Sequence, residues 1–214
     1  MQLTIFGATG KTGMRLVQQA LDAGHAVRAF VRDPAKLSIS HDKLQAVQGD
    51  ILDAASVDAA LSQPADAVLS ALGIFHREPK TDLSDGTANV ISAMQKHGIK
   101  RLGVVSSLGA GDSAGQGNFL ARNLQKFLLS HVLADKERQE QLIMSSGLDW
   151  TIVRPPQLTD DDRICEKVVA WVGPTPKGAR LTWKTSRATV AGFLLKAVAQ
   201  GSHIGEAVNI SEPK

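Results

Sequence analysis

The chain has no tyrosine and only one cysteine among its 214 residues. The absence of tyrosine excludes catalysis in which a phenol of this chain donates a proton. The single cysteine, Cys165, cannot form an internal disulfide, which favours a reducing compartment and an idle thiol. The acidic run Asp160 to Asp162 lacks metal-ligand spacing and clustered histidines, so we predict no metal site and expect these carboxylates to be solvated.

Long hydrophobic runs and an excess of one charge are also missing. The most apolar late stretch, Val190 to Val198, is short and interrupted by Lys196. With no visible signal peptide, this predicts a cytoplasmic protein without a membrane span. The net charge is +3, from 24 basic and 21 acidic residues, and the basic residues are scattered. That balance argues against nucleic acid as a partner.

A glycine-rich turn near the start of the chain is the strongest positive feature. Residues 3–6 predict a buried strand, glycines then follow in GxxGxxG spacing, and apolar residues recur with helical spacing from Lys11 onward. Glycines let the backbone turn tightly and approach a pyrophosphate, while free N–H groups at the helix start point toward it. Strand, glycine turn and helix in this order predict a dinucleotide site. The cofactor-binding residues predicted here are Gly7, Thr9, Gly10, Lys11, Thr12 and Gly13.

The end of the second predicted strand indicates which dinucleotide is preferred. Arg32 stands where an NAD-binding chain would place an acidic side chain for the ribose 2′-hydroxyl. Asp33 precedes Pro34 and is better explained as a helix N-cap. Arg32 and Lys36 together predict a clamp for the 2′-phosphate of NADPH; the alternative is two solvated surface cations.

Strand-like and helix-like segments alternate along the chain without a linker or repeat. Further strands are predicted at 25–31, 44–47, 67–72, 102–106 and 150–153, with helices at 54–61, 88–96 and 120–144. This alternation predicts an α/β fold, a Rossmann-type doubly wound parallel sheet, in one domain over residues 1–214. A less regular segment, mainly 155–187, is predicted to form the substrate side. Helix 189–199 and a short edge strand at 206–210 complete the predicted order.

Six motifs give the chain a family resemblance. GATGKTG, VRD, GDILD, SALG, VVSSLGA and IVRPPQL follow one another over nearly the whole sequence. In this order they resemble the atypical, NmrA-like branch of the short-chain dehydrogenase/reductase superfamily, and within it the NADPH-dependent flavin and biliverdin reductases. The resemblance implies NADPH or NADP along the strand ends, with flavin as a substrate rather than a tightly bound cofactor. Further cofactor contacts are predicted from Asp50, Ile51, Leu72, Gly73, Ser106, Pro155 and Pro156.

The proton donor of that superfamily is missing here. Classical members carry a Tyr-x-x-x-Lys pair, in which the lysine lowers the pKa of the phenol and the tyrosine protonates the carbonyl. Aligning HVLADKERQEQL with this pattern places Lys136 at the lysine and Val132 at the tyrosine. Lys136 then either reaches the nicotinamide ribose or remains a solvated lysine on an exposed helix face.

Two other polar residues complete the predicted catalytic set. Ser107 stands where the superfamily has its active-site serine, although its hydroxyl could equally stabilise the turn in SSLGAG. Gln157 stands where the biliverdin reductases carry a histidine, and glutamine can orient a substrate but cannot act as an acid. The predicted catalytic residues are therefore Ser107, Lys136 and Gln157. Phe75, Trp171 and Trp183 are candidates for contact with a flat substrate.

Without the phenol, the sequence favours a particular class of acceptor. Hydride addition to an isolated ketone leaves a basic alkoxide that needs a positioned acid. A flavin, quinone or linear tetrapyrrole spreads the charge by conjugation, so its reduction needs mainly orientation. The sequence predicts an NADPH-dependent reductase of planar small molecules, as a monomer or weak homodimer. The alternative is a non-catalytic NADP(H)-binding redox sensor of the NmrA-like type.

Overall fold

The computed structural model describes residues 1–73, 78–117 and 130–214. Its β-strands are β1 (Gln2–Phe6), β2 (Ala26–Val31), β3 (Leu44–Gln48), β4 (Ala67–Ser70), β5 (Arg101–Val105), β6 (Asp149–Arg154), β7 (Gln157–Thr159), β8 (Val169–Val172), β9 (Lys184–Ser186) and β10 (Glu206–Ser211). Its α-helices are α1 (Lys11–Asp22), α2 (Ala54–Leu61), α3 (Asp82–Lys96), α5 (Ser130–Met144) and α6 (Arg187–Ala199). Two short 3-10 turns, η1 (Pro34–Lys36) and η2 (Gly111–Ser113), follow β2 and β5.

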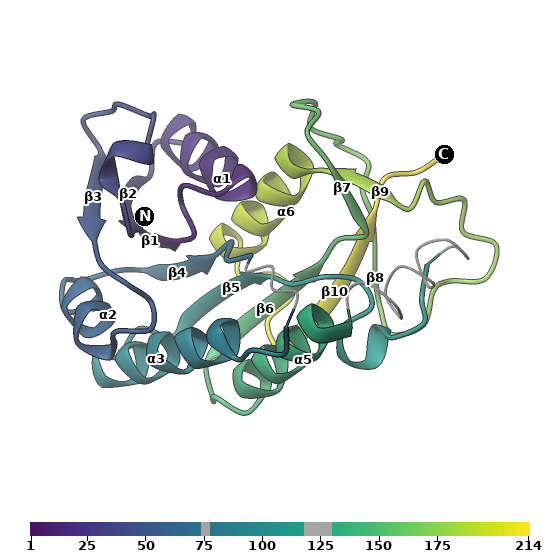
Figure 1. The fold of residues 1–214 in the computed structure, drawn as a ribbon. Helices are drawn as coiled ribbons and strands as arrows, with labels where there is room; N and C mark the ends of the chain where they lie inside the picture. Colours follow the sequence, from purple (N-terminus) through teal and green to yellow (C-terminus); the bar gives the residue numbers. More distant parts are fainter. Residues whose placement is uncertain (74–77, 118–129) are drawn as a thin grey trace.

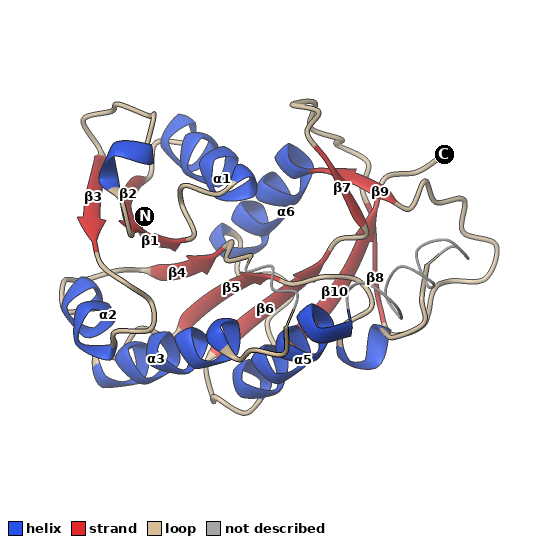
Figure 2. Ribbon diagram, viewed as in Figure 1, coloured by secondary structure: helices blue, strands red, loops and turns tan. Residues whose placement is uncertain are grey.

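The described strands form a large sheet in the order β3-β2-β1-β4-β5-β6-β10-β8 (Figures 1 and 2). All neighbours pair in parallel except β10 and β8. The chain reverses its direction of winding between β1 and β4, where crevices for ligands form at the carboxyl ends of the strands. The predicted α/β fold with a doubly wound sheet is therefore confirmed.

Helices cover both faces of the sheet. Helices α1 and α6 lie side by side on one face, and α2, α3 and α5 lie on the other (Figure 1). One buried apolar cluster fills the space under α1 and α6, and a second fills the space under the other three helices. Both faces are covered, so the central strands read as apolar runs; Leu3 and Ile5 are at most 1% exposed.

Two predicted elements differ from the structure. Strand β10 is not an edge strand, because it lies between β6 and β8, and β8 forms the edge instead. Val208 and Ile210 are almost completely buried, because their side chains pack in the apolar cluster under α1 and α6. Helix α3 begins at Asp82 rather than at residue 88, since the Asp135 carboxylate accepts hydrogen bonds from the Leu83 and Ser84 N–H groups.

The substrate-side segment forms a small unit of its own. Strands β7 and β9 pair as a separate parallel ribbon. A third apolar cluster of Leu108, Trp171 and Leu181 packs this segment onto the loop that follows β5. None of the described helices is both long and apolar enough to cross a membrane.

Candidate functional site

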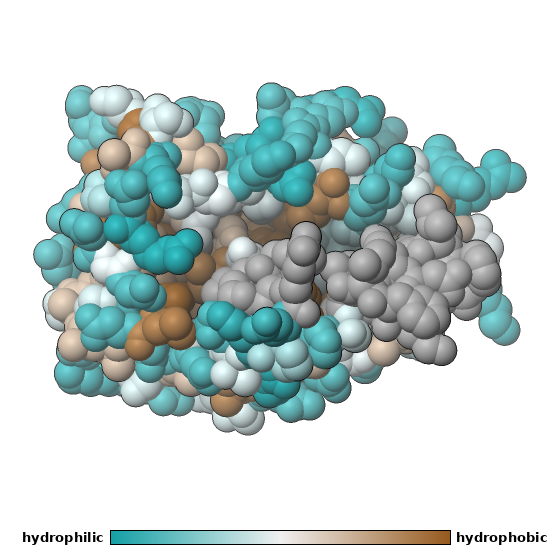
Figure 3. Space-filling view, in the orientation of Figure 1, coloured by the Kyte–Doolittle hydropathy of each residue, from teal (hydrophilic) through white to brown (hydrophobic). Residues whose placement is uncertain are grey.

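A cleft of about 560 Å³ opens at the carboxyl ends of β1, β2 and β4. Figure 3 shows apolar surface gathered in a hollow near the middle of this face, with hydrophilic residues around it. Eight of the residues predicted to bind a cofactor line the cleft: Gly7, Thr9, Gly10, Arg32, Asp50, Ile51, Leu72 and Gly73. The other predicted ones, Lys11, Thr12, Gly13, Lys36, Ser106, Pro155 and Pro156, lie outside this lining.

Backbone packing shapes the glycine turn at the floor of the cleft. Gly7 has a φ of 74°, and a Cβ atom there would lie 2.8 Å from the Ala71 carbonyl. A Cβ on Gly13 would lie only 2.0 Å from the Gly7 carbonyl oxygen. Only glycine fits at either place, so the first turn of α1 sits directly against the end of β1, and the free N–H groups of a helix start favour an anion there. This cradle fits a dinucleotide pyrophosphate.

The rim of the cleft carries the predicted phosphate clamp. Arg32 lines the cleft, whereas Lys36 is exposed and its amine lies 3.8 Å from the Asp33 carboxylate. Asp33 accepts a hydrogen bond from the Ala35 N–H at 3.1 Å and caps η1, which confirms the N-cap prediction. Asp33 is thereby held by its own turn, and Arg32 is the cation placed beside the site.

Local contacts fix the opposite wall. The Asp50 carboxylate accepts a hydrogen bond from the Leu52 N–H, and the Asn89 amide donates to the Ile51 carbonyl at 2.9 Å. Gly86 in α3 lacks a side chain where a Cβ would lie 2.7 Å from Ile51. Helix α3 therefore approaches closely enough to hold the Ile51 side chain in the cleft wall.

The loops after β5 and β6 are tied together. Ser106 N–H donates to the Val153 carbonyl, and Leu108 N–H donates to the Pro155 carbonyl at 2.8 Å. Ser107 is half-buried between these bonds, and its hydroxyl lies 3.3 Å from the Leu108 carbonyl. Among the described residues, the buried hydroxyls of Ser70 and Ser106 have no hydrogen-bond partner. Unpaired hydroxyls where β4 and β5 end fit a polar ligand along this edge.

Lys136 is not the solvated lysine that the sequence left open. It is 8% exposed, on the face of α5 that also buries Asp135, Gln139 and Glu140. Burial lowers the pKa of Lys136 to about 8, although the charges of Glu140 and Asp135 oppose the shift. No hydrogen bond or ion pair joins its amine to another described residue. Lys136 is thus a buried amine poised to titrate just above neutral pH.

Arg154, at the end of β6, is the largest fully buried side chain in the described structure, at 1% exposure. Its Nε and Nη2 atoms donate to the two oxygens of Glu140 at 3.0 and 2.6 Å, and Nη1 donates to Asp112 in η2. Burial alone would lower the pKa of Arg154, but hydrogen bonds and charge from Glu140 and Asp112 outweigh it and raise the pKa. Sequence reasoning missed this network, because its partners come from three distant segments.

The acidic run also makes contacts that the sequence did not reveal. Asp160 pairs with Lys11 at 2.7 Å and with Arg187, and Asp162 accepts from Arg15 Nε at 2.9 Å. The Lys11 hydrogen bond is the main cause of a lowered pKa at Asp160. These carboxylates therefore dock the loop after β7 onto the start of α1. The described residues contain no cluster of three or more metal-binding side chains.

The remaining predicted residues lie on the substrate side. Gln157 is exposed as the first residue of β7. Trp171 and Trp183 pack edge to face with ring centres 6.4 Å apart, and Trp183 borders a second hollow with Asp112. Trp183 has a φ of 56°, which is rare for a bulky residue. Phe75 lies outside the described residues.

Some known proteins are similar to this chain in sequence, and others are similar in fold. An Arabidopsis thaliana chloroplastic protein, uncharacterized, is 35% identical over 73% of this chain, and the chain spans 59% of that protein's length. A Bacillus subtilis protein named as an uncharacterized sugar epimerase is 30% identical over 75% of this chain and 74% of its own length. The solved structure of an anaerobillin reductase from Escherichia coli O157:H7 has a TM-score of 0.83 at 25% identity, covering 100% of this chain and 98% of that one.

A family model described as NAD(P)H-binding matches residues 7–201, a range that includes the glycine turn, the cleft and both tied loops. The match agrees with the cradle that Gly7 and Gly13 form. The chain belongs to the NAD(P)H-binding family of Rossmann-fold proteins.

Proposed function

We propose that the protein is an NADPH-dependent reductase that passes hydride to a planar conjugated acceptor, a flavin such as FMN or riboflavin, a quinone or biliverdin. The observation that carries the proposal is a dinucleotide cleft with Arg32 at its rim in a chain without tyrosine. The similarity to a structure named as a reductase supports hydride transfer. The motif resemblance to flavin and biliverdin reductases supports the acceptor class.

The residues at the cleft would bind and orient the cofactor. The N–H groups at the start of α1 would hold the pyrophosphate, and the Arg32 guanidinium would bind the 2′-phosphate. Asp50 and Ile51 would flank the adenine. When bound, the reduced nicotinamide supplies the hydride.

The chain's own groups on the acceptor side are few. Ser107 would hydrogen-bond to the acceptor or the nicotinamide, and Gln157 would orient the acceptor or a water molecule. Lys136 would face the nicotinamide ribose as a cation at neutral pH, because its pKa is about 8. No strong acid is required, since a conjugated acceptor delocalises the charge it gains. Orientation at near-attack distance then provides the rate.

Steady-state NADPH oxidation with FMN, riboflavin, a quinone and biliverdin tests the proposal. We expect turnover with at least one of them and much slower turnover with NADH. Gly13→Ala, which fills the cradle, serves as a cofactor-binding control in the same assay.

Tight NADPH binding with no turnover of any acceptor would instead favour a non-catalytic redox sensor of the NmrA-like type, which the missing phenol also allows. The epimerase name of the Bacillus subtilis relative gives less support, because sugar epimerases of this superfamily rely on the phenol that this chain lacks.

A further inference from the structure

Buried charges converge on one side of α5. Lys136 and Glu140 are four residues apart on the same helix, at 8% and 2% exposure, and residues at this spacing are neighbours on a helix face, where a lysine and a glutamate can pair. Here both oxygens of Glu140 are bonded to Arg154 instead. The carboxylate one turn from Lys136, Glu140, is therefore already paired with Arg154.

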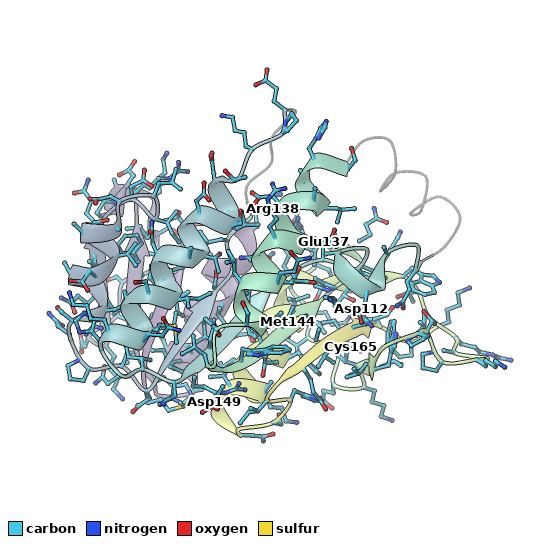
Figure 4. The ribbon with its side chains drawn as sticks, turned by 90° about the horizontal axis from the view of Figure 1, so that it is seen from below. Asp112, Glu137, Arg138, Met144, Asp149 and Cys165 are labelled. Carbon is cyan, nitrogen blue, oxygen red and sulfur yellow. The ribbon has the colours of Figure 1, made fainter. Side chains whose placement is uncertain are left out.

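The backbone of η2 packs closely against the ion pair of Arg154 and Glu140. Gly111 in η2 has a φ of 52°, and a Cβ there would lie 2.9 Å from Glu140 Oε2 and 3.1 Å from Arg154 Nη2. The turn thus closes directly over the pair, and Asp112 adds a second carboxylate to Arg154. Figure 4 shows Asp112 and its turn next to α5.

Arg154 also connects the elements that carry the predicted catalytic residues. It ends β6, directly before Pro155 and three residues before Gln157, where β7 starts. Through Asp112 it holds the loop that begins at Ser107, and through Glu140 it holds α5 one turn beyond Lys136. A single guanidinium thus fixes these segments relative to one another.

We propose that Arg154 is a positioning residue for the acceptor side of the site: by binding both oxygens of Glu140, it keeps the Lys136 ammonium unpaired and available to the bound nicotinamide and acceptor. The inference rests on the proposed function only for what Lys136 does there. That Arg154 withholds Glu140 from Lys136 stands on the described contacts alone.

The test must distinguish Glu140 from the other charged groups around Lys136. Asp135 and Glu140 lie on its own helix, Arg154 comes from β6 and Asp112 from η2. Helix α3, which packs against α5, contributes Asp82 and Asp85 in its first turn. Asp135 is bonded to the start of α3, and Asp85 accepts from Thr81 Oγ1 at 2.7 Å. Glu140 is therefore the carboxylate whose pairing Arg154 controls.

The experiment is an NMR titration of lysine Cε signals in the full chain, with Lys136 assigned from its loss in Lys136→Met. We expect the Lys136 midpoint near pH 8 in the wild type. In Arg154→Met it should rise by about one unit or more, because Glu140 becomes free to pair with the ammonium. In Glu140→Gln it should fall below the wild-type value, and in Arg154→Met/Glu140→Gln it should return close to it.

The matched control is Arg101→Met. Arg101 is also a buried arginine, 8% exposed, but it bonds to the Asp149, Ala197 and Ser202 carbonyls at the other end of the sheet. It should lose stability without moving the Lys136 midpoint. If Arg154→Met does not fold, Arg154→Lys provides the test, because it keeps the positive charge but cannot bind both Glu140 oxygens in the same bidentate way. A Lys136 midpoint in Arg154→Lys that equals the wild-type value overturns the inference.

The pH profile of kcat distinguishes the inference from the proposed function. A Lys136 midpoint that does not move in folded Arg154→Met overturns the inference. If both the midpoint and the alkaline limb of kcat move upward while KM for NADPH is unchanged, both proposals are supported. If the midpoint moves and the kcat profile does not, the inference stands and the assigned role of Lys136 in the proposed function fails.

Discussion

The two ends of the candidate site are built by different means. At the glycine turn, backbone groups and small residues form the cradle, and the main determinants lie within a few residues of one another. Beside α5, the site rests on three buried charges from two elements, Lys136 and Glu140 of α5 and Arg154 of β6. The first end is therefore encoded locally, and the second depends on tertiary contacts that bring ions out of water together.

The largest expected effect tests the locally encoded end. Gly13→Ala places a Cβ 2.0 Å from the Gly7 carbonyl oxygen, a clash between two backbone segments that no side-chain rotation relieves. We expect NADPH binding, measured by calorimetry, to be abolished and the free energy of unfolding to fall by roughly 3 kcal/mol or more. Gly192→Ala is the control, because the one close approach of its Cβ, at 2.9 Å, would be to the flexible end of Gln19 in another helix, and Ile164 at 3.8 Å is an ordinary contact. Equal losses in the two variants would contradict the cradle.

The end beside α5 should show the opposite behaviour: the protein should become more stable when the charge of Lys136 is removed. The folded pKa of Lys136, about 8, lies below the ordinary 10.5, so the unfolded state binds the extra proton. The resulting penalty is fully present below pH 8 and vanishes as the pH rises to 10.5. Lys136→Met should therefore stabilise the protein at pH 7 by on the order of 3 kcal/mol, and turnover should fall.

Denaturant unfolding of both proteins at pH 7 and pH 10.5 measures this difference. The gap should close at the higher pH. A variant that is less stable than the wild type at pH 7 would show that Lys136 is held by a favourable interaction, contrary to its burial without a partner.

A smaller effect is expected at the rim, where Arg32 faces solvent. Arg32→Ala should weaken NADPH binding roughly 10- to 100-fold and leave NADH binding nearly unchanged. The expected loss corresponds to a charge-assisted hydrogen bond of about 1.5–3 kcal/mol. Lys36→Ala should have a lesser effect, because Lys36 lies outside the cleft lining. Titration of each variant with both cofactors gives the comparison, and equal weakening for NADPH and NADH would defeat the clamp.

The smallest effect concerns a residue that the chain lacks. Val132→Tyr restores the Tyr-x-x-x-Lys spacing on α5 and introduces the only tyrosine, so its ionisation can be followed by ultraviolet absorbance without background. We expect NADP to shift the pKa of this phenol, because the alignment places it beside the bound nicotinamide; Lys136, with a pKa of about 8, is largely neutral where a phenol ionises. An unshifted phenol would show that the alignment with the superfamily pattern is wrong.

The cleft could be located from sequence patterns for a physical reason. GxxGxxG after an apolar strand and the Asp-Pro cap after Arg32 are local signals: Gly7, Gly10 and Arg32 line the cleft, and Asp33 caps η1. The strands were equally readable, since buried parallel strands are runs of apolar residues.

The missed features all depend on contacts that are distant in sequence. The start of α3 was hidden because its first turns are polar, and the carboxylate that caps them, Asp135, lies about 50 residues later (separations of 52 and 51). β10 was taken for an edge strand because β8, its partner, is short and half-exposed. Lys136 could not be distinguished from a surface lysine, because its helix alternates charges like a solvated one. Only the packing of α5 against α3 shows that these charges are buried.

The edge-to-face pair of Trp171 and Trp183 gives the molecule a built-in optical probe. The third tryptophan, Trp150, is near the amino end of the interior strand β6 and packs against the apolar cluster under α2, α3 and α5. With no tyrosine in the chain, ultraviolet emission comes almost wholly from these indoles. Changes in emission on adding an acceptor can thus be assigned by removing one indole at a time, without any attached label.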